Sequence, residues 1–203
     1  MDNIIQNVLD KIKSLQANNE YLIIAIDGRC AAGKSTLAKN IKSNLDCNVI
    51  HVDHFFLRPE QKTNNRLNEP GGNVDYERFY SDIIIPLRDK RSFSYTPYDC
   101  RLQKMSSPVK IDPKAVNVIE GAYSCHPVFN DHYDYRIFID IDDKEQKRRI
   151  MKRNGKAVYK IFKEKWIPME ELYFSAFNIK DKCDIILIQK NINNEFATVP
   201  DPD

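Results

Sequence analysis

The chain has 203 residues, which is enough for one α/β domain with its own buried core and short for two. Apolar residues make up 42% of it and aromatic residues 10%, and this composition excludes a disordered chain. Its 31 Lys and Arg residues nearly balance its 29 Asp and Glu residues, so the overall charge gives no reason to expect nucleic acid or a membrane as a partner.

The start of the chain predicts a helix, a strand, a loop, a second helix and a second strand. Apolar residues at helical spacing over residues 3–17 predict a helix within the N-terminal segment 1–19. Tyr21–Ile26 is a short, β-branched apolar run of the kind found in buried parallel strands. A glycine-bounded loop follows it, then a helix over Lys34–Leu45 and a short strand over Val49–Val52.

The middle of the chain holds the least regular segments. Residues 58–74 are polar and contain prolines and glycines, which predicts a long loop, and long loops inside compact domains are often functional. Asp75–Arg88 has an apolar face at helical spacing. We expect Phe93–Tyr95 and Pro108–Ile111 to form a small antiparallel pair that flanks the loop Tyr98–Met105.

The rest of the chain returns to the alternating pattern. Strands are predicted at Val116–Ile119, Tyr135–Ile141 and Cys183–Ile188, and helices at Lys144–Arg153 and Trp166–Phe177. Strands that alternate with helices predict a parallel sheet covered on both faces. No internal repeat or low-complexity linker interrupts the pattern, so we expect one domain over residues 1–203 that ends in a polar tail at residues 191–203.

The sequence also bears on the compartment. No window approaches the roughly 18 continuous apolar residues of a membrane-spanning helix, and the first residues lack the pattern of a signal peptide. The five cysteines form no CxxC pair, so we expect free thiols and a cytoplasmic protein. The number of subunits stays open, a homo-oligomer included.

The loop after the first strand carries a phosphate-binding motif. Gly28 to Ser35 fits the pattern G-x-x-x-x-G-K-[ST], in which backbone N–H groups and the N-terminal end of the next helix surround a phosphate. We expect Lys34 to reach the β- and γ-phosphates of ATP and Ser35 to hold Mg²⁺. The expected nucleotide-binding residues are Gly28, Ala31, Ala32, Gly33, Lys34, Ser35 and Thr36.

Two acids follow buried strands, at the edge where open α/β sheets bind ligands. We expect Asp53 to accept the proton of an acceptor hydroxyl, with a second role at Mg²⁺ through water. Glu120 is expected to belong to the metal shell, in the position of a Walker B acid. Asp140 and Asp142 also end a strand, and we expect them to cap the helix that begins near residue 143.

Seven basic side chains crowd the segment from Lys144 to Lys156. This pattern fits a solvated face, a nucleic-acid patch or a lid that closes on phosphates. No aromatic stacking platform accompanies the charges, which argues against nucleic acid. We favour a lid region over residues 144–165, with Arg149 and Arg153 on one helix face and Gly155 as a hinge.

These pieces together resemble the uridine kinase family of P-loop kinases, which is related to phosphoribulokinase and pantothenate kinase. The resemblance runs from about Ile23 to Leu187. Besides the phosphate loop, it rests on Val52-Asp53-His54-Phe55-Phe56, Tyr95-Thr96-Pro97-Tyr98-Asp99, Val118-Ile119-Glu120-Gly121 and the helix Gln146–Arg153.

The resemblance implies a P-loop NTPase fold: a three-layer α/β sandwich with a five-stranded parallel sheet, a lid helix and a small hairpin over the acceptor. It implies that Asp53 is the catalytic base, that Tyr98 lines a nucleoside pocket, and that Arg149 and Arg153 act from the lid. The implied ligands are ATP, Mg²⁺ and a small hydroxyl-bearing acceptor, first of all a nucleoside such as uridine or cytidine.

The acceptor segments depart from the family pattern. The family usually carries a histidine after the Tyr-Asp pair, and this chain has Cys100-Arg101 there; the loop over residues 68–73 also differs. The acceptor therefore stays open among nucleosides, nicotinamide riboside, pantothenate, glycerate and sugar phosphates. The candidate acceptor-binding residues are Asp53, Phe55, Phe56, Tyr76, Tyr98 and Arg101, with Arg58 as a further cation.

Other classes of function are weighed against kinase activity. A GTPase switch needs an Asn-Lys-x-Asp base reader, which the chain lacks, and a binding-only protein would function without Asp53. The four histidines have no metal-ligand spacing, and we expect only His54 to lie near the chemistry.

Overall fold

The computed structural model describes residues 3–189 and 196–198. Its centre is a sheet in the order β10-β9-β8-β1-β7-β2, in which five neighbouring strands run parallel and β10 pairs antiparallel with β9. The strands are β1 (Leu22–Gly28), β2 (Cys47–His51), β7 (Val116–Glu120), β8 (Tyr135–Ile141), β9 (Ile185–Gln189) and β10 (Phe196–Thr198). The predicted five-stranded parallel sheet is confirmed. Strand β10 falls in the expected polar tail, the rest of which lies outside the described residues.

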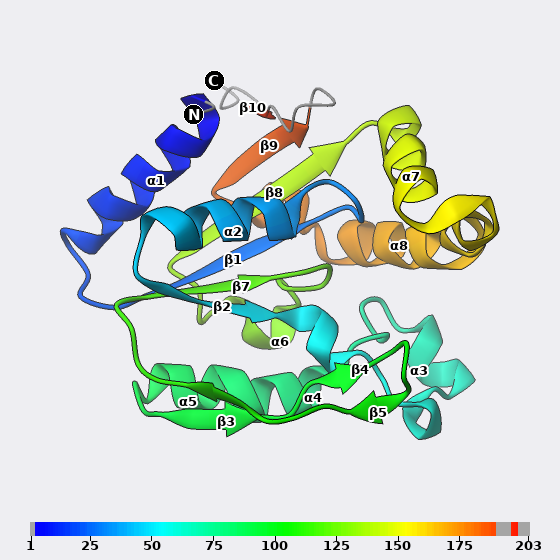
Figure 1. The fold of residues 1–203 in the computed structure, drawn as a ribbon, viewed down its shortest axis with the longest axis horizontal. Helices are drawn as coiled ribbons and strands as arrows, with labels where there is room; N and C mark the ends of the chain where they lie inside the picture. The colour runs from blue at the N-terminus through cyan, green and yellow to red at the C-terminus, as the bar shows by residue number, and fades with distance from the viewer. Residues whose placement is uncertain (1–2, 190–195, 199–203) are drawn as a thin grey trace.

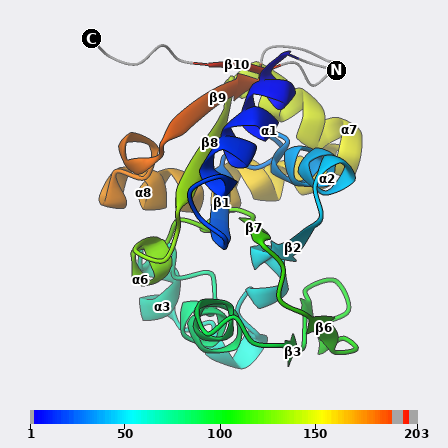
Figure 2. The same cartoon turned by 90° about the vertical axis from the view of Figure 1, so that its left-hand side faces the viewer.

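Helices cover both faces of this sheet, which gives three layers (Figures 1 and 2). Helices α1 (Asn3–Gln16) and α2 (Lys34–Asn44) lie on one face, and α6 (Pro127–Asn130) and α8 (Ile167–Phe177) lie on the other. Successive residues of β1 alternate between the two cores: Ile24 and Ile26 pack toward α1 and α2, and Ile23 and Ala25 pack toward α8. Both faces of a covered parallel strand are buried, which explains its continuous apolar run.

The parallel register brings the functional segments to one edge. Glu120, the last residue of β7, lies opposite Ile26 of β1 on one side and His51 of β2 on the other. The carboxyl ends of β1, β7 and β2 therefore meet, and the loops that follow them share one edge of the sheet.

The chain between β2 and β7 forms a lower unit of short elements (Figure 1). The region 58–74, predicted as a loop, contains two short helices. At the start of the first, the Gln61 side chain accepts from the N–H of Arg58, and at the start of the second, the Thr63 hydroxyl accepts from the N–H of Arg66. The predicted helix Asp75–Arg88 is confirmed as one continuous run of helical elements. The helical elements here are η1 (Val52–Phe55), η2 (Pro59–Gln61), α3 (Asn64–Asn68), α4 (Tyr76–Phe79), η3 (Tyr80–Ile84) and α5 (Ile85–Arg88).

Two small hairpins complete this unit. Strand β3 (Phe93–Tyr95) pairs antiparallel with β6 (Val109–Ile111), as predicted. The intervening loop forms a second pair, β4 (Tyr98–Asp99) with β5 (Lys104–Met105). Strand β4 contacts η1, so this hairpin is positioned beside the segment that carries Asp53.

The basic helix is longer than predicted. Helix α7 runs from Asp143 to Ile161 with non-helical torsions at Gly155 (φ 83°, ψ 169°), and η4 (Phe162–Trp166) joins it to α8. Asp142 caps α7 as expected, through the N–H groups of Lys144 and Glu145. Asp140 does not cap it, because its carboxylate forms an ion pair with Lys180 at 2.7 Å. Across the described residues, no helix combines the length and apolar character that a membrane span requires.

Gly28 makes a backbone contact that only glycine permits. A Cβ atom there would lie 2.1 Å from the carbonyl oxygen of Ile139, and its φ is +133°. We expect Gly28→Ala to lower the free energy of unfolding by about 3 kcal/mol, from steric conflict and backbone strain together. Urea unfolding measures this loss. Gly155→Ala is the matched control, because open space surrounds that position and only backbone strain of about 1 kcal/mol is expected. Equal losses of unfolding free energy in the two variants would contradict a steric conflict between a side chain at position 28 and the Ile139 carbonyl.

Candidate active site

The phosphate loop connects β1 to α2 at the ligand-binding edge of the sheet. Ala31 (φ 62°) and Gly33 (φ 110°) have left-handed backbone torsions, which turn the loop into the start of α2 at Lys34. The Lys34 side chain is only 8% exposed, and its Nζ donates to the carbonyl oxygens of Gly28 at 2.6 Å and Arg29 at 3.0 Å. The loop therefore has the shape that surrounds a phosphate, with its lysine folded against it.

A buried carboxylate, which we did not assign a role from the sequence, fixes the entry to this loop. Asp27 is fully buried and accepts hydrogen bonds from four donors. These are the N–H groups of Gly28 (2.7 Å), Tyr123 (3.2 Å) and Cys125 (2.8 Å), and the hydroxyl of Tyr173 (2.8 Å). Burial raises the pKa of Asp27, and the N–H donors and Lys34 oppose that rise. The only sequence signal for this role is its place directly before the motif.

Helices α7 and α8 hold the middle of the loop. The N–H of Cys30 donates to Oε2 of Glu170 at 2.9 Å, and Nε2 of Gln146 donates to the carbonyl of Cys30 at 3.2 Å. Both partners are buried, and both lie more than 100 residues away in the sequence. Burial raises the pKa of Glu170 to about 7, although Lys34 and the N–H of Cys30 counteract the rise. Neither residue was identified from the sequence.

The neighbouring loop residues are tied to the same helices. The guanidinium of Arg29 lies 2.7 Å from Asp143 at the start of α7 and 2.9 Å from Glu171 on α8. Arg149 of α7 donates to the carbonyl of Ala31 at 3.3 Å. The loop and the lid region are therefore one hydrogen-bonded assembly.

Ser35, Glu120 and His51 form a polar chain at the N-terminal start of α2. The hydroxyl of Ser35 lies 3.1 Å from both carboxylate oxygens of Glu120. Nδ1 of His51 lies 2.5 Å from Oε1 of Glu120, and this hydrogen bond raises the pKa of His51 above its ordinary value. We expected only His54 near the chemistry, but His54 contacts the hydroxyl of Tyr95 at 3.1 Å, and His51 contacts the predicted metal-shell acid.

Asp53 lies beside this chain, at the start of the segment that follows β2. Its side chain is open to solvent within the cavity, yet the surrounding protein partly desolvates the carboxyl group and raises its pKa. The charge of Lys34 counteracts the rise in the pKa of Asp53, and the charge of Glu120 adds to it. A carboxylate with a raised pKa is a better proton acceptor, so the position suits a general base.

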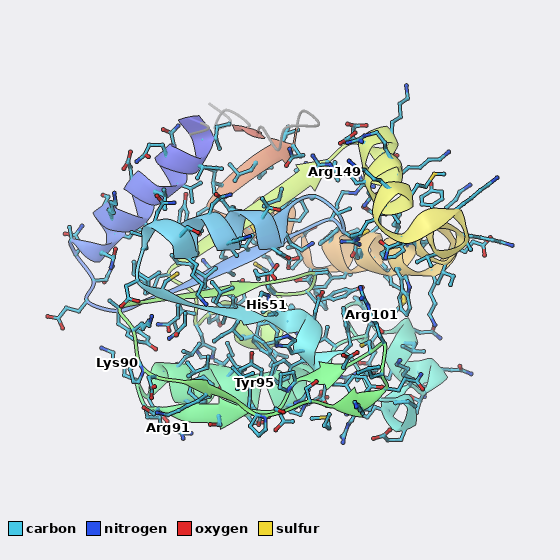
Figure 3. The ribbon with its side chains drawn as sticks, in the orientation of Figure 1. His51, Lys90, Arg91, Tyr95, Arg101 and Arg149 are labelled. Atoms are coloured by element: carbon cyan, nitrogen blue, oxygen red, sulfur yellow. The ribbon has the colours of Figure 1, made fainter. Side chains whose placement is uncertain are left out.

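A cavity of about 1000 Å³ joins these groups. Lys34, Ser35, Asp53 and Glu120 line it, as do Arg149 and Arg153 of the predicted lid. Figure 3 shows Arg149 beside α7 and Arg101 on the opposite side, above the β4–β5 hairpin. The structure therefore brings the predicted metal, base and lid residues and five of the seven predicted nucleotide-binding residues to one space, whereas Gly28 and Ala32 are buried and do not line it. Their roles stay predictions.

The predicted acceptor-binding residues divide into two groups. Arg101, Phe56 and Asp53 line the cavity, and Phe55, Tyr76 and Tyr98 do not. Phe55 is fully buried between the rings of Phe79 (4.9 Å) and Tyr95 (5.4 Å), so it belongs to the core.

The two tyrosines also have other neighbours. Tyr76 stacks on His126 at 4.5 Å with the Arg66 guanidinium 3.8 Å from its ring, which fixes the segment before α4. Tyr98 is 4% exposed within the β4–β5 hairpin. Arg58 forms an ion pair with Glu60 at 3.4 Å and does not line the cavity either.

The donor set at Ser35 fits Mg²⁺ shared with a nucleotide. Within residues 3–189, no cluster of three or more His, Cys, Asp or Glu side chains could hold a metal ion alone. Mg²⁺ is commonly bound by one or two protein oxygens together with substrate phosphates. The Ser35 hydroxyl and the Glu120 carboxylate lie beside the phosphate loop and match that pattern.

Comparisons with known proteins agree with this fold. No family model matches the chain, and no curated protein matches it. A solved structure from Bacillus stearothermophilus, described as a possible uridine kinase, superposes with a TM-score of 0.69 at 18% identity, covering 90% of this chain and 96% of that one. A Silicibacter protein provisionally described as a fructose transport system kinase gives 0.63 at 19% identity, covering 85% and 93%. At this identity the likeness establishes a shared α/β fold.

The contact between Glu170 and the loop predicts a pH-dependent stability. The folded pKa of Glu170, about 7, exceeds the ordinary value of 4.5, so between these values the folded protein keeps a proton that the unfolded chain has lost. This group's contribution to stability therefore falls as pH rises from 4.5 to 7. Glu170→Gln removes the titration, and the variant should gain on the order of 2–3 kcal/mol relative to wild type across that window.

Urea unfolding of both proteins at several pH values between 4.5 and 7.5 measures this gain. Glu171→Gln, on the same helix but half exposed, controls for the loss of one negative charge. A difference between Glu170→Gln and wild type that does not vary with pH would contradict the prediction.

Proposed function

We propose that the protein is a kinase that uses ATP and Mg²⁺ to phosphorylate a hydroxyl group of a small acceptor. The observation that carries this proposal is the shared cavity: the phosphate loop, Ser35 with Glu120, and Asp53 all line one space. A phosphoryl transfer site needs a phosphate cradle, oxygen ligands for Mg²⁺ and a group that accepts the hydroxyl proton.

Each group then has a role in one balanced step. The loop N–H groups and Lys34 bind the triphosphate, and Ser35 with Glu120 holds Mg²⁺, which supplies charge neutralisation at the phosphates. The acceptor oxygen forms a bond to the γ-phosphorus as the bond from that phosphorus to the β,γ-bridging oxygen breaks. Asp53 takes the hydroxyl proton, and ADP leaves with the electron pair of the broken bond. Arg149 and Arg153 stabilise the negative charge that spreads over the transferred group.

The acceptor remains the open part of this proposal. The sequence resemblance favours a nucleoside such as uridine or cytidine, and the same chemistry suits nicotinamide riboside, pantothenate, glycerate or a sugar phosphate. An acceptor screen that follows ADP release, with uridine and cytidine included, tests the reaction and identifies the acceptor together. A regulatory NTPase would instead hydrolyse ATP at a rate that no small hydroxyl compound increases.

Asp53→Asn tests the base. The amide keeps the size of the carboxylate but accepts no proton, so turnover should fall by about a hundredfold or more while the KM for ATP stays within a few-fold. Steady-state kinetics with the best acceptor from the screen measure both. Asp181→Asn, an exposed acid that does not line the cavity, should leave turnover unchanged. Normal turnover by Asp53→Asn would remove this residue from the role.

Lys34→Ala tests the phosphate loop. Without the ammonium group, both ATP affinity and kcat should fall, because Lys34 is expected to contact the β- and γ-phosphates. Calorimetry with a non-hydrolysable ATP analogue measures affinity separately from turnover, and EDTA should abolish turnover of the wild-type protein. Unchanged ATP binding by the variant would show that the loop does not hold the triphosphate.

A further inference from the structure

One side of the cavity is built by the segment between β2 and β7 and faces the phosphate loop and α7. It is lined by the acceptor wall, which we define as Asp53, Phe56, Lys62, Asn73 and Arg101. These residues come from η1, from the region 58–74 and from the β4–β5 hairpin. Asp53 is the predicted base, so the rest of the acceptor wall surrounds the place where an acceptor hydroxyl must lie.

Asn73 is a polar group that the protein itself does not satisfy. The residue is 6% exposed, and its backbone carbonyl accepts from the N–H of Leu57 at 3.0 Å. Its side-chain amide makes no hydrogen bond to any part of the chain that the structure describes. Buried amides are normally hydrogen-bonded, so one that faces a cavity without a protein partner is available to a polar ligand.

The backbone around Asn73 is fixed by close contacts. A Cβ on Gly72 would lie 2.0 Å from the carbonyl of Arg66, and one on Gly71 would lie 2.7 Å from the ring of His126. The Arg66 guanidinium donates to the carbonyls of Gly72 at 3.1 Å and Val74 at 2.9 Å. The backbone that carries Asn73 is therefore fixed before any ligand binds, which limits the positions that its amide can take.

Two cations of the acceptor wall also lack partners. Lys62 and Arg101 are exposed to the cavity, and neither side chain forms an ion pair or a hydrogen bond with any described residue. The other arginines nearby are neutralised: Arg58 pairs with Glu60, Arg66 with Glu77 and Arg78 with Asp75. Lys62 and Arg101 thus differ from these arginines in forming no ion pair, although backbone hydrogen bonds and then the charge of Arg101 lower the pKa of the neighbouring Asp99.

These two charges are not needed for the triphosphate. Lys34 lies in the phosphate loop, and four further cavity cations, Arg148, Arg149, Lys152 and Arg153, lie on α7. Lys62 and Arg101 come from the segment between β2 and β7, which also carries Asp53 and Phe56. An anion bound to them would lie on the acceptor side of the cavity and would form charge-assisted hydrogen bonds.

We propose that the acceptor carries an anionic group, a phosphate or a carboxylate, bound by Lys62 and Arg101 while Asn73 hydrogen-bonds a neighbouring polar group. The inference rests on the proposed kinase function and names the substrate class. It favours hydroxy acids and sugar phosphates over neutral nucleosides and over the cationic nicotinamide riboside. The guanidinium of Arg101 can bind either anion through two parallel hydrogen bonds, and Lys62 adds a point charge.

Matched acceptor pairs test the charge requirement. ADP release should be measured with ribose against ribose 5-phosphate, glycerol against glycerate, and uridine against uridine 5′-phosphate. The anionic member of at least one pair should have a kcat/KM about a hundredfold or more above its neutral partner. The sugar-phosphate and glycerate arms separate a phosphate from a carboxylate requirement. Equal or better turnover of the neutral members would overturn the inference and leave the kinase proposal standing.

Substitutions then assign the effect to residues. Lys62→Ala and Arg101→Ala should each raise the KM for the anionic acceptor at least tenfold, with kcat and the KM for ATP within about twofold. Lys104→Ala is the matched control, because Lys104 carries the same charge on the same hairpin and does not line the cavity. Asn73→Asp, nearly isosteric, should raise the same KM by charge repulsion, with thermal unfolding as the check on folding. An unchanged KM in both cation variants would overturn the proposal.

A binding measurement does not depend on finding the natural acceptor. Protein saturated with Mg²⁺ and a non-hydrolysable ATP analogue should bind inorganic phosphate by calorimetry, at least fivefold more weakly after Lys62→Ala or Arg101→Ala. No phosphate binding by this complex, or binding that both variants retain, would overturn the inference. Failure of the analogue itself to bind would instead overturn the kinase proposal, so the two failures are distinguishable.

Discussion

The arrangement of this site depends on one buried carboxylate. Asp27 collects N–H groups from the first residue of the phosphate loop and from the turn after β7, together with the hydroxyl of Tyr173 on α8. Burying a carboxylate is costly unless donors surround it, so these groups are held where Asp27 requires them. The carboxylate therefore sets the positions of three chain segments relative to one another, and the cavity is the space that they leave.

Two other parts of the chain complete the cavity around the phosphate loop. Gln146 and Arg149 of α7 and Glu170 of α8 form hydrogen bonds with the phosphate loop. These bonds join the lid region to the loop. On the other side, the segment between β2 and β7 supplies Asp53 and the rest of the acceptor wall. The side built by the phosphate loop, α7 and α8 is thus the proposed triphosphate site, and the segment between β2 and β7 builds the proposed acceptor site.

The sequence analysis found those features of the fold and the site that local residue patterns encode. The parallel strands, the phosphate loop and the two strand-end acids were found because apolar runs, motif spacing and strand ends are visible along one chain. Asp27, Gln146 and Glu170 were missed, since their roles come from contacts across 96 residues or more, beside the local bond of Asp27 to Gly28. Phe55 was assigned to the acceptor by its type and position, yet ring packing against Phe79 and Tyr95, which only the folded chain defines, places it in the core.

The non-helical torsions at Gly155 divide α7 into two portions. The portion before it is anchored to the loop by Gln146 and Arg149, and α8 is anchored there by Glu170. Between these anchors, Phe162 and Trp166 border the cavity, and nothing lies within 4 Å of a Cβ at Gly155. A change of torsion at Gly155 would move the segment between these anchors while its two ends stay attached to the phosphate loop. Such a movement would therefore be short, and the phosphate loop would keep its shape.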